Sequence, residues 1–285
     1  MPPSKRSRTK TKTSAAATVT SRKYTRPGVE AAARLLSLPR SSSTDEHRWN
    51  VALTYYESML RSKGGETLVH LDERRNAIAR EWNSVDNTAY LTKDQLMDVI
   101  LKWKFAKGKP RNALIPLLQS NSPQSVMEYS KRALEYASST SSPSTKESSD
   151  VQDEGNTISL AIKELCHLKG VGPATASAIL SMHNPDIFAF MDDEVIECLY
   201  EGKRGYTLKI YEEVNARCME IAGELNSAAG PGKGGEWTPY QVGQVLWTVA
   251  TMKAWKEEEG LSEVFEEREE CTEDLEGEKK SKRKR

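Results

Sequence analysis

Apolar residues recur three or four positions apart over most of the chain between residues 28 and 256. This period places apolar side chains on one face of a helix, whereas a half-buried strand would show strict alternation. The pattern therefore predicts an all-α fold. Thr238 and Pro239 supply a capping residue and a first-turn proline for the last helix. The predicted helices are 46–62, 71–82, 92–104, 123–137, 157–168, 173–182, 192–200, 207–226 and 239–256.

The two ends of the chain and one internal stretch lack this helical period. Residues 1–27 contain almost no large apolar side chain, so burial cannot offset the entropy lost on ordering, and we expect a disordered basic arm. Residues 257–285 are predicted to form a disordered tail, acidic and then basic. The Ser- and Thr-rich stretch 138–155 is predicted to be a loop. A single helical domain, residues 28–256, lies between the two charged tails.

The charges balance overall but are unevenly placed. Residues 1–27 hold eight cations and no acid, residues 257–278 hold twelve acids and one Arg, and residues 279–285 hold six cations. The remaining body has 26 basic and 29 acidic residues, so any contact with nucleic acid must be local, because counterion release needs several cations together. The closing basic run has the composition of a nuclear import signal and predicts a nuclear location. The alternative is a solvated tail without a specific role.

Several classes of protein are not expected from this composition. No apolar run approaches the roughly 20 residues that cross a bilayer, and the N-terminus lacks the apolar stretch of a signal peptide. The cysteines lie far apart, without the paired spacing of a zinc site or an iron–sulfur cluster, so we expect no metal and no cofactor. These cysteines are Cys166, Cys198, Cys218 and Cys271.

The most informative stretch runs from Thr157 to His183. Apolar residues of 157–168 form one helical face, and the glycine-rich residues 169–172 end that helix. Pro173 opens a second helix whose alternate positions carry alanine, which allows close packing on a neighbour. The stretch therefore predicts two short helices joined by a tight hairpin.

The backbone of this hairpin is suited to phosphate. Glycine permits the turn and keeps side chains away, so amides at the start of the second helix can face an anion. The predicted donors are the amides of Gly172, Ala174 and Thr175, with the Thr175 hydroxyl as an accessory donor and Lys169 as a nearby cation. In the alternative, the glycines only allow a turn and Val171 plugs the core. The predicted backbone-binding residues of the hairpin are Lys169, Gly170, Val171, Gly172, Ala174 and Thr175.

The run from Leu168 to Leu180, Leu-Lys-Gly-Val-Gly-Pro-Ala-Thr-Ala-Ser-Ala-Ile-Leu, resembles the hairpin of the helix-hairpin-helix DNA glycosylase superfamily. The convincing part of the resemblance covers residues 157–200. It implies a helical bundle of the glycosylase type and double-stranded DNA as the partner. Contact through the hairpin would read the DNA backbone and not its sequence.

The resemblance also implies a place for a catalytic carboxylate. In that family an aspartate about twenty residues after the second glycine stands at the start of a later helix. Asp192 lies twenty residues after Gly172, but Asp193 follows directly, so the register stays open between the two. Such a carboxylate would stabilise positive charge on the sugar as the base departs, or orient a water. In the alternative, the aspartates only cap a helix.

Two departures from the family pattern bear on activity. Members with lyase activity carry a lysine two residues after the second glycine, where this chain has Ala174, and a methyl group forms no Schiff base. Glu194 adds negative charge where DNA would pass, which favours a noncatalytic relative. The resemblance thus predicts a monofunctional glycosylase at most, with no lyase activity through position 174.

Residues 102–111 form a second region of interest, with five cations, two aromatic residues and no acid. The helical period predicts that Trp103 is buried. Gly108 and Pro110 indicate a loop, so Lys107, Lys109 and Arg111 are predicted to be exposed and to contact DNA phosphates.

Three functions remain open from the sequence: a glycosylase acting on a damaged or mismatched base, a noncatalytic chromatin or repair scaffold, and a helical protein-interaction domain that binds no DNA. One structural feature separates the first from the others. An aspartate of the 192–193 pair at the mouth of a cleft that the hairpin also lines would favour the enzyme.

Overall fold

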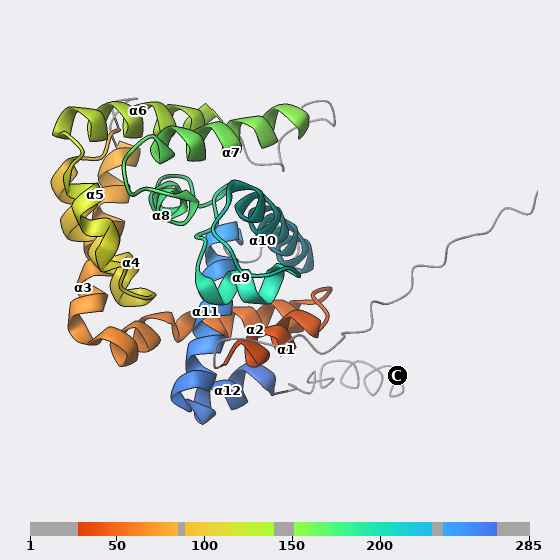
Figure 1. The fold of residues 1–285 in the computed structure, drawn as a ribbon. Coiled ribbons are helices and arrows are strands. Elements are labelled where there is room, and N and C mark those ends of the chain that lie inside the picture. Colours follow the sequence, from red (N-terminus) through yellow and green to blue (C-terminus); the bar gives the residue numbers. More distant parts are fainter. Residues whose placement is uncertain (1–27, 85–88, 140–150, 230–235, 267–285) are drawn as a thin grey trace, which may run out of the picture.

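The computed structural model describes residues 28–84, 89–139, 151–229 and 236–266, which form helices joined by short connections (Figure 1). No strand occurs within these ranges, so the predicted all-α class is confirmed. None of their helices is long and apolar enough to traverse a bilayer. The elements are α1 (Val29–Ser37), α2 (Ser43–Thr54), α3 (Tyr56–Ser84), the π-helix η1 (Gln95–Leu101), α4 (Lys102–Lys107), the 3₁₀ turn η2 (Asn112–Leu114), α5 (Ile115–Gln119), α6 (Pro123–Ser139), α7 (Val151–Cys166), α8 (Pro173–His183), α9 (Asp193–Leu199), α10 (Leu208–Ala229), α11 (Pro239–Trp255) and α12 (Glu258–Phe265).

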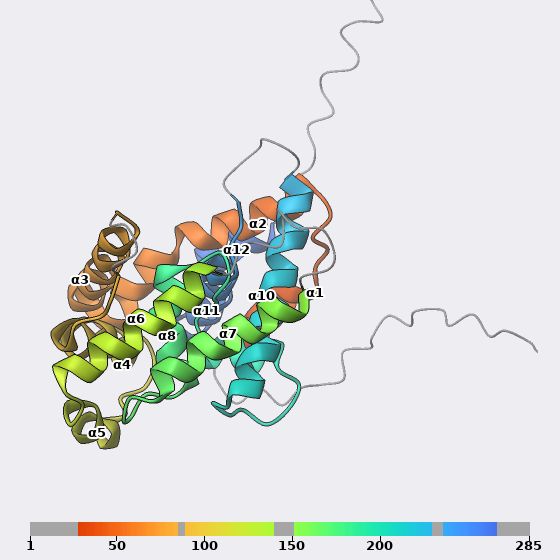
Figure 2. The same cartoon turned by 90° about the horizontal axis from the view of Figure 1, so that it is seen from above.

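Helix α8 lies in the interior of one half of the molecule. Helices α6 and α7 run side by side across it, and α3 and α10 also pack on it (Figures 1 and 2). All of its residues from Thr175 to Met182 are buried. Because its small and apolar residues leave no polar face, this helix is stable only when neighbours surround it. The second helix of the hairpin is thereby firmly anchored.

Helix α11 is the buried helix of the other half. It packs on α1, α2, α3, α9, α10 and α12. It begins as predicted, since the Thr238 side chain accepts the Gln241 amide, the Gln241 side chain accepts the Thr238 amide, and Pro239 stands in the first turn. Helix α9 packs on α1, α10 and α11 and begins at Asp193, so the two predicted aspartates lie at its N-terminal end.

Other elements differ from the predicted pattern in detail. The predicted helix 92–104 is a π-helical segment followed by α4. The predicted helices 46–62 and 71–82 are instead α2 and a long α3, which bends at Gly65, where φ is 64°. Only a residue that tolerates the left-handed region allows such a bend within one helix.

The predicted domain limits and loop were partly wrong. Helices α1 and α12 were not predicted, and α12 lies in the segment assigned to the disordered tail. Its Leu261 and Val264 are buried, which anchors it to the domain. The predicted loop 138–155 is shorter, because α6 extends to Ser139 and α7 begins at Val151. The basic arm 1–27, residues 140–150 and residues 267–285 lie outside the described part of the chain.

Candidate functional site

The hairpin joins α7 to α8, and its two glycines have different surroundings. Gly170 has φ +80°, and a Cβ built there would lie 2.9 Å from Leu118 Cγ, so both conformation and space require glycine. Gly172 is extended, with φ −117°, and a Cβ there would meet no atom within 4 Å. Any residue could adopt the backbone of Gly172. The absence of a side chain at Gly172 therefore serves to leave space for a ligand in front of the loop.

The loop lies at the surface while its central residue points inward. Gly170 and Gly172 are half-buried and Lys169 is exposed. Val171 is buried, as expected for a core plug, and its amide donates to Leu168 O at 3.1 Å. Within the described chain, the amides of Gly172 and Ala174 make no hydrogen bond. These two predicted donors are thus available to an anion.

The predicted role of the Thr175 amide needs correction. This amide donates to Gly172 O at 2.8 Å, so the helix itself uses it. The Thr175 residue is 3% exposed, although it lines the pocket described below. The helical bond forms because Gly172 is the N-cap of α8 and its carbonyl already accepts the first bonds of the helix.

Asn121 positions the hairpin and was not predicted. Its Oδ1 accepts the Lys169 amide at 2.9 Å, and its Nδ2 donates to Lys169 O at 3.0 Å. Asn121 stands between α5 and α6 and is buried. Its two partners lie 48 residues away along the chain, so no local pattern marks this contact.

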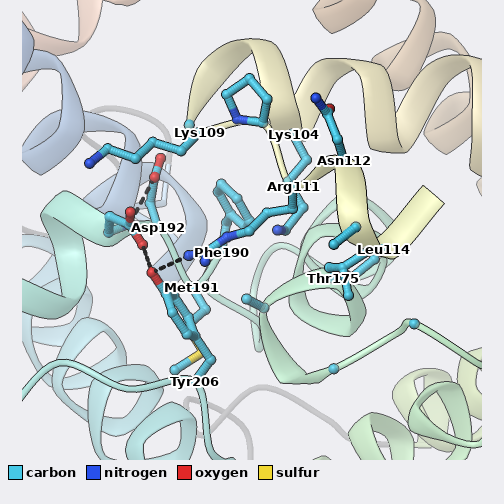
Figure 3. A pocket seen from close by; sticks show the side chains of 17 residues that line it. Lys104, Lys109, Arg111, Asn112, Leu114, Thr175, Phe190, Met191, Asp192 and Tyr206 are labelled. Atoms are coloured by element: carbon cyan, nitrogen blue, oxygen red, sulfur yellow. Dashed lines mark hydrogen bonds between the residues drawn. The ribbon is translucent and has the colours of Figure 1, made fainter. Parts of the chain in front are cut away.

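A pocket of about 550 Å³ opens beside the hairpin (Figure 3). Three parts of the chain line it: residues 108–114 with Lys104, the hairpin with Gly170, Gly172, Ala174 and Thr175, and residues 190–193 with Tyr206. The structure thus brings together the hairpin, the basic 102–111 region and the aspartate pair. The criterion that favours an enzyme is met, because both aspartates line the same pocket as the hairpin.

Asp192 is the N-cap of α9 and is 4% exposed. Its Oδ1 accepts the Asp193 amide at 2.9 Å, and its Oδ2 accepts Lys107 Nζ at 2.5 Å. Burial alone would raise the pKa of Asp192, but the charge and hydrogen bond of Lys107 outweigh it, so the pKa lies below the ordinary value. The carboxylate is therefore held in its ionised form.

Lys107 was predicted to be exposed, and this prediction is wrong. The residue is 2% exposed, and four aromatic rings surround its ammonium. Trp103 is buried as predicted, and Lys107 follows it by one helical turn on the same inward face. Burial lowers the pKa of Lys107, although Asp192 opposes this shift. A buried ammonium paired with Asp192 is not free to act as a surface ligand of phosphate.

Lys109 and Arg111 are exposed, as predicted, and Arg111 also reaches across the pocket. Its Nη2 donates to the Tyr206 hydroxyl at 2.9 Å, and that hydroxyl donates to Asp193 Oδ1 at 2.6 Å (Figure 3). Tyr206 lies between α9 and α10 and was not predicted as a site residue. Nothing in its local pattern distinguishes it from a packing tyrosine.

The position of Glu194 weakens one argument against catalysis. The sequence suggested that its charge faces passing DNA, but the residue is 6% exposed. Its Oε1 lies 3.9 Å from Lys63 Nζ of α3, which offsets its charge. Glu194 therefore adds little repulsion at the surface.

In the described ranges, no group of three or more His, Cys, Asp or Glu side chains is arranged to hold a metal ion. The cysteines described there, Cys166, Cys198 and Cys218, are free thiols.

Comparison with protein-family models gave no match, and neither curated proteins nor solved structures gave one. Membership of the helix-hairpin-helix glycosylase superfamily therefore remains a prediction. It rests on the motif of residues 157–200.

Proposed function

We propose that the protein binds double-stranded DNA by its backbone, through the α7–α8 hairpin and the rim of the adjacent pocket. The open amides of Gly172 and Ala174, beside the exposed Lys169, carry this proposal. Amides at a helix N-terminus with a nearby cation are suited to one phosphate group. Lys109 and Arg111 extend the cationic surface along the pocket edge.

The enzymatic form of this function is hydrolysis of the glycosidic bond of a damaged or mismatched base. Asp192 and Asp193 line the same pocket as the hairpin, so a DNA strand held there would bring a nucleotide next to a carboxylate. A base must leave the stack to enter such a pocket. An ionised carboxylate stabilises the positive charge that the sugar gains as the base departs. Ala174 supplies no amine, so we expect no lyase activity through that position.

Fluorescence anisotropy with a labelled duplex tests the DNA-binding proposal. Lys169→Glu should weaken binding at least several-fold at low salt, since it reverses a charge at the phosphate contact. The matched control is Lys131→Glu, on the exposed face of α6. Equal affinities of wild type and Lys169→Glu would rule out the hairpin as the contact.

A panel of duplexes with different damaged or mismatched bases, followed by alkali cleavage of abasic sites, tests the enzymatic form. Release of a base should disappear in Asp192→Asn or in Asp193→Asn, which would also assign the register. Duplex binding without release from any lesion would support the noncatalytic scaffold. One observation favours that second function: protein donors already occupy both oxygens of Asp192.

We further propose a nuclear location, on the basis of the basic run 279–285. A fluorescent fusion of the full chain should accumulate in nuclei. The same fusion lacking residues 279–285 should spread through the cell, and unchanged nuclear accumulation would assign the signal elsewhere.

A further inference from the structure

Behind the pocket wall, buried and half-buried charged side chains from three helices lie around Asp192. Lys107 comes from the end of α4, Lys63 from α3, and Asp192 and Glu194 from the start of α9. The contact between Lys107 Nζ and Asp192 Oδ2 is the shortest of these, at 2.5 Å, and the side chains of this pair are 3% and 4% exposed. Asp192 thus faces the pocket on one side and a buried ammonium on the other.

The surroundings of Lys107 leave its ammonium little freedom. Nζ lies 4.1 Å from the ring centroid of Trp247, 5.3 Å from Phe190, 5.7 Å from Trp103 and 5.8 Å from Tyr56. Aromatic faces attract a cation and exclude water. With water excluded, the attraction between ammonium and carboxylate is stronger than at the surface.

We propose that Lys107 is a positioning residue of this site, whose ammonium holds the Asp192 carboxylate ionised and fixes its orientation at the pocket wall. This inference rests on the proposed function, since it gives Asp192 the role of the acting carboxylate. The Asp193 amide binds Oδ1 and Lys107 binds Oδ2, so the plane of the carboxylate is determined. Lys107 itself is not among the residues that line the pocket, which assigns it to positioning and not to attack on the substrate.

The other charged groups near Asp192 do not replace Lys107. The charge of Lys63 of α3 also lowers the pKa of Asp192, but less than the charge of Lys107 does. The charge of Asp192 in turn raises the pKa of Lys104 of α4. Glu194 and Asp193 belong to the same helix start as Asp192, and a hydrogen bond with the Glu194 side chain lowers the pKa of Asp192 less than Lys107 does. Removal of Lys107 would therefore leave the buried Asp192 without the group that lowers its pKa most. The protonated form of Asp192 would then be favoured.

A carboxyl-observed NMR titration of the full chain tests this inference. In wild type the Asp192 carboxyl should titrate below the ordinary midpoint of about 3.9. In Lys107→Met, which keeps an apolar side chain of similar length against the rings, the midpoint should move above that value. An Asp192 midpoint that is the same in both proteins would overturn the proposal.

Two further measurements keep the test decisive if Lys107→Met does not fold. Lys107→Arg keeps a cation and should keep the low midpoint. In wild type alone, the Lys107 Nζ resonance should shift at the same pH as the Asp192 carboxyl, because the two groups share one contact. Separate midpoints for the two resonances would contradict the assignment.

The titration uses no DNA, so its outcome is independent of the lesion panel. If no base is released but the midpoints behave as stated, the proposed enzyme fails and the electrostatic role of Lys107 stands. If release is found, the acidic limb of the pH–rate profile should move to higher pH in Lys107→Met. A purely structural lysine would reduce the amount of folded protein without moving that limb.

Discussion

Gly170 and Gly172 occupy equivalent places in the sequence motif but meet different demands in the structure. At Gly170 the backbone is left-handed and Leu118 leaves no room for a Cβ. At Gly172 the backbone is extended and the space in front is empty. One glycine is therefore needed for folding, and the other leaves two amides accessible.

The two alanine substitutions should separate these roles. Gly170→Ala should lower the free energy of unfolding by about 1–3 kcal/mol, because alanine is strained at positive φ and its methyl group would crowd Leu118. Gly172→Ala should change stability by no more than about 0.5 kcal/mol but weaken duplex binding, since its methyl group stands before the amides. Urea unfolding and anisotropy measure the two quantities. Equal stability losses in both variants would contradict this assignment.

The lowered pKa of Asp192 predicts how the stability of the fold depends on pH. Its pKa is lowered in the folded protein, so its pairing stabilises the fold above the ordinary carboxyl range, and this stabilisation is lost as the pH falls through the folded value. The free energy of unfolding should therefore drop below about pH 4. Asp192→Asn should remove that part of the dependence and cost about 3 kcal/mol or more at pH 7, because Lys107 would stay buried without its partner.

Asp98→Asn is the matched control for this experiment. Asp98 pairs with Lys102 at 2.7 Å, but both side chains are more than half exposed. Solvent screens such a pair, so its loss should hardly alter stability at pH 7. A similar loss in both variants would show that burial does not govern the Asp192 pair.

At the scale of elements, the hairpin depends on the turn between α5 and α6. Asn121→Ala removes both hydrogen bonds to Lys169 and leaves the partly buried Lys169 backbone groups without that partner. We expect a loss of about 1–3 kcal/mol and faster hydrogen exchange at the Lys169 amide. Gln119→Ala, at an exposed position two residues earlier, serves as control. Unchanged exchange in Asn121→Ala would mean that other contacts hold the hairpin.

Helix α12 should behave as part of the domain, although its sequence is acidic. Truncation after residue 266 should leave the melting temperature unchanged. Truncation after residue 256 removes the buried Leu261 and Val264, each worth about 1.5–3 kcal/mol, and should lower it markedly. Calorimetry of the two truncated chains measures the difference, and equal melting temperatures would place the domain boundary before α12.

At the scale of the whole molecule, the charge distribution predicts a modest salt dependence for the helical domain. Lys104, Lys109, Arg111 and Lys169 are the cations nearest the hairpin and pocket. With about 0.9 counterions released per neutralised phosphate, residues 28–266 should show a slope of about −3 to −4 in log affinity against log salt. Arg111→Ala should reduce the slope by about one. The full chain, with fifteen further cations in its terminal segments, should show a steeper slope; identical slopes would exclude the tails from binding.

The chain by itself determined the helical class, the hairpin and the burial of Trp103, because each follows from periodicity or backbone preference within about twenty residues. The helix cap at Thr238 was also predictable from the local sequence. A helix cap at one of the two aspartates 192–193 also follows from their place before an apolar helical run, and the structure assigns it to Asp192. Helix α12 was not predicted, because its composition is acidic and its few apolar residues stabilise it only when α2 and α11 cover them.

Tertiary structure alone decided how the site is assembled. The pair Lys107–Asp192, the chain Arg111–Tyr206–Asp193 and the contact of Asn121 with the hairpin each join residues far apart in sequence, and only the fold sets these distances. A lysine side chain can bind phosphate when it is exposed to water, whereas a buried lysine beside a carboxylate is its counterion. Packing decides whether a lysine is exposed or paired with a buried carboxylate, because packing sets its neighbours. The local sequence does not contain this information.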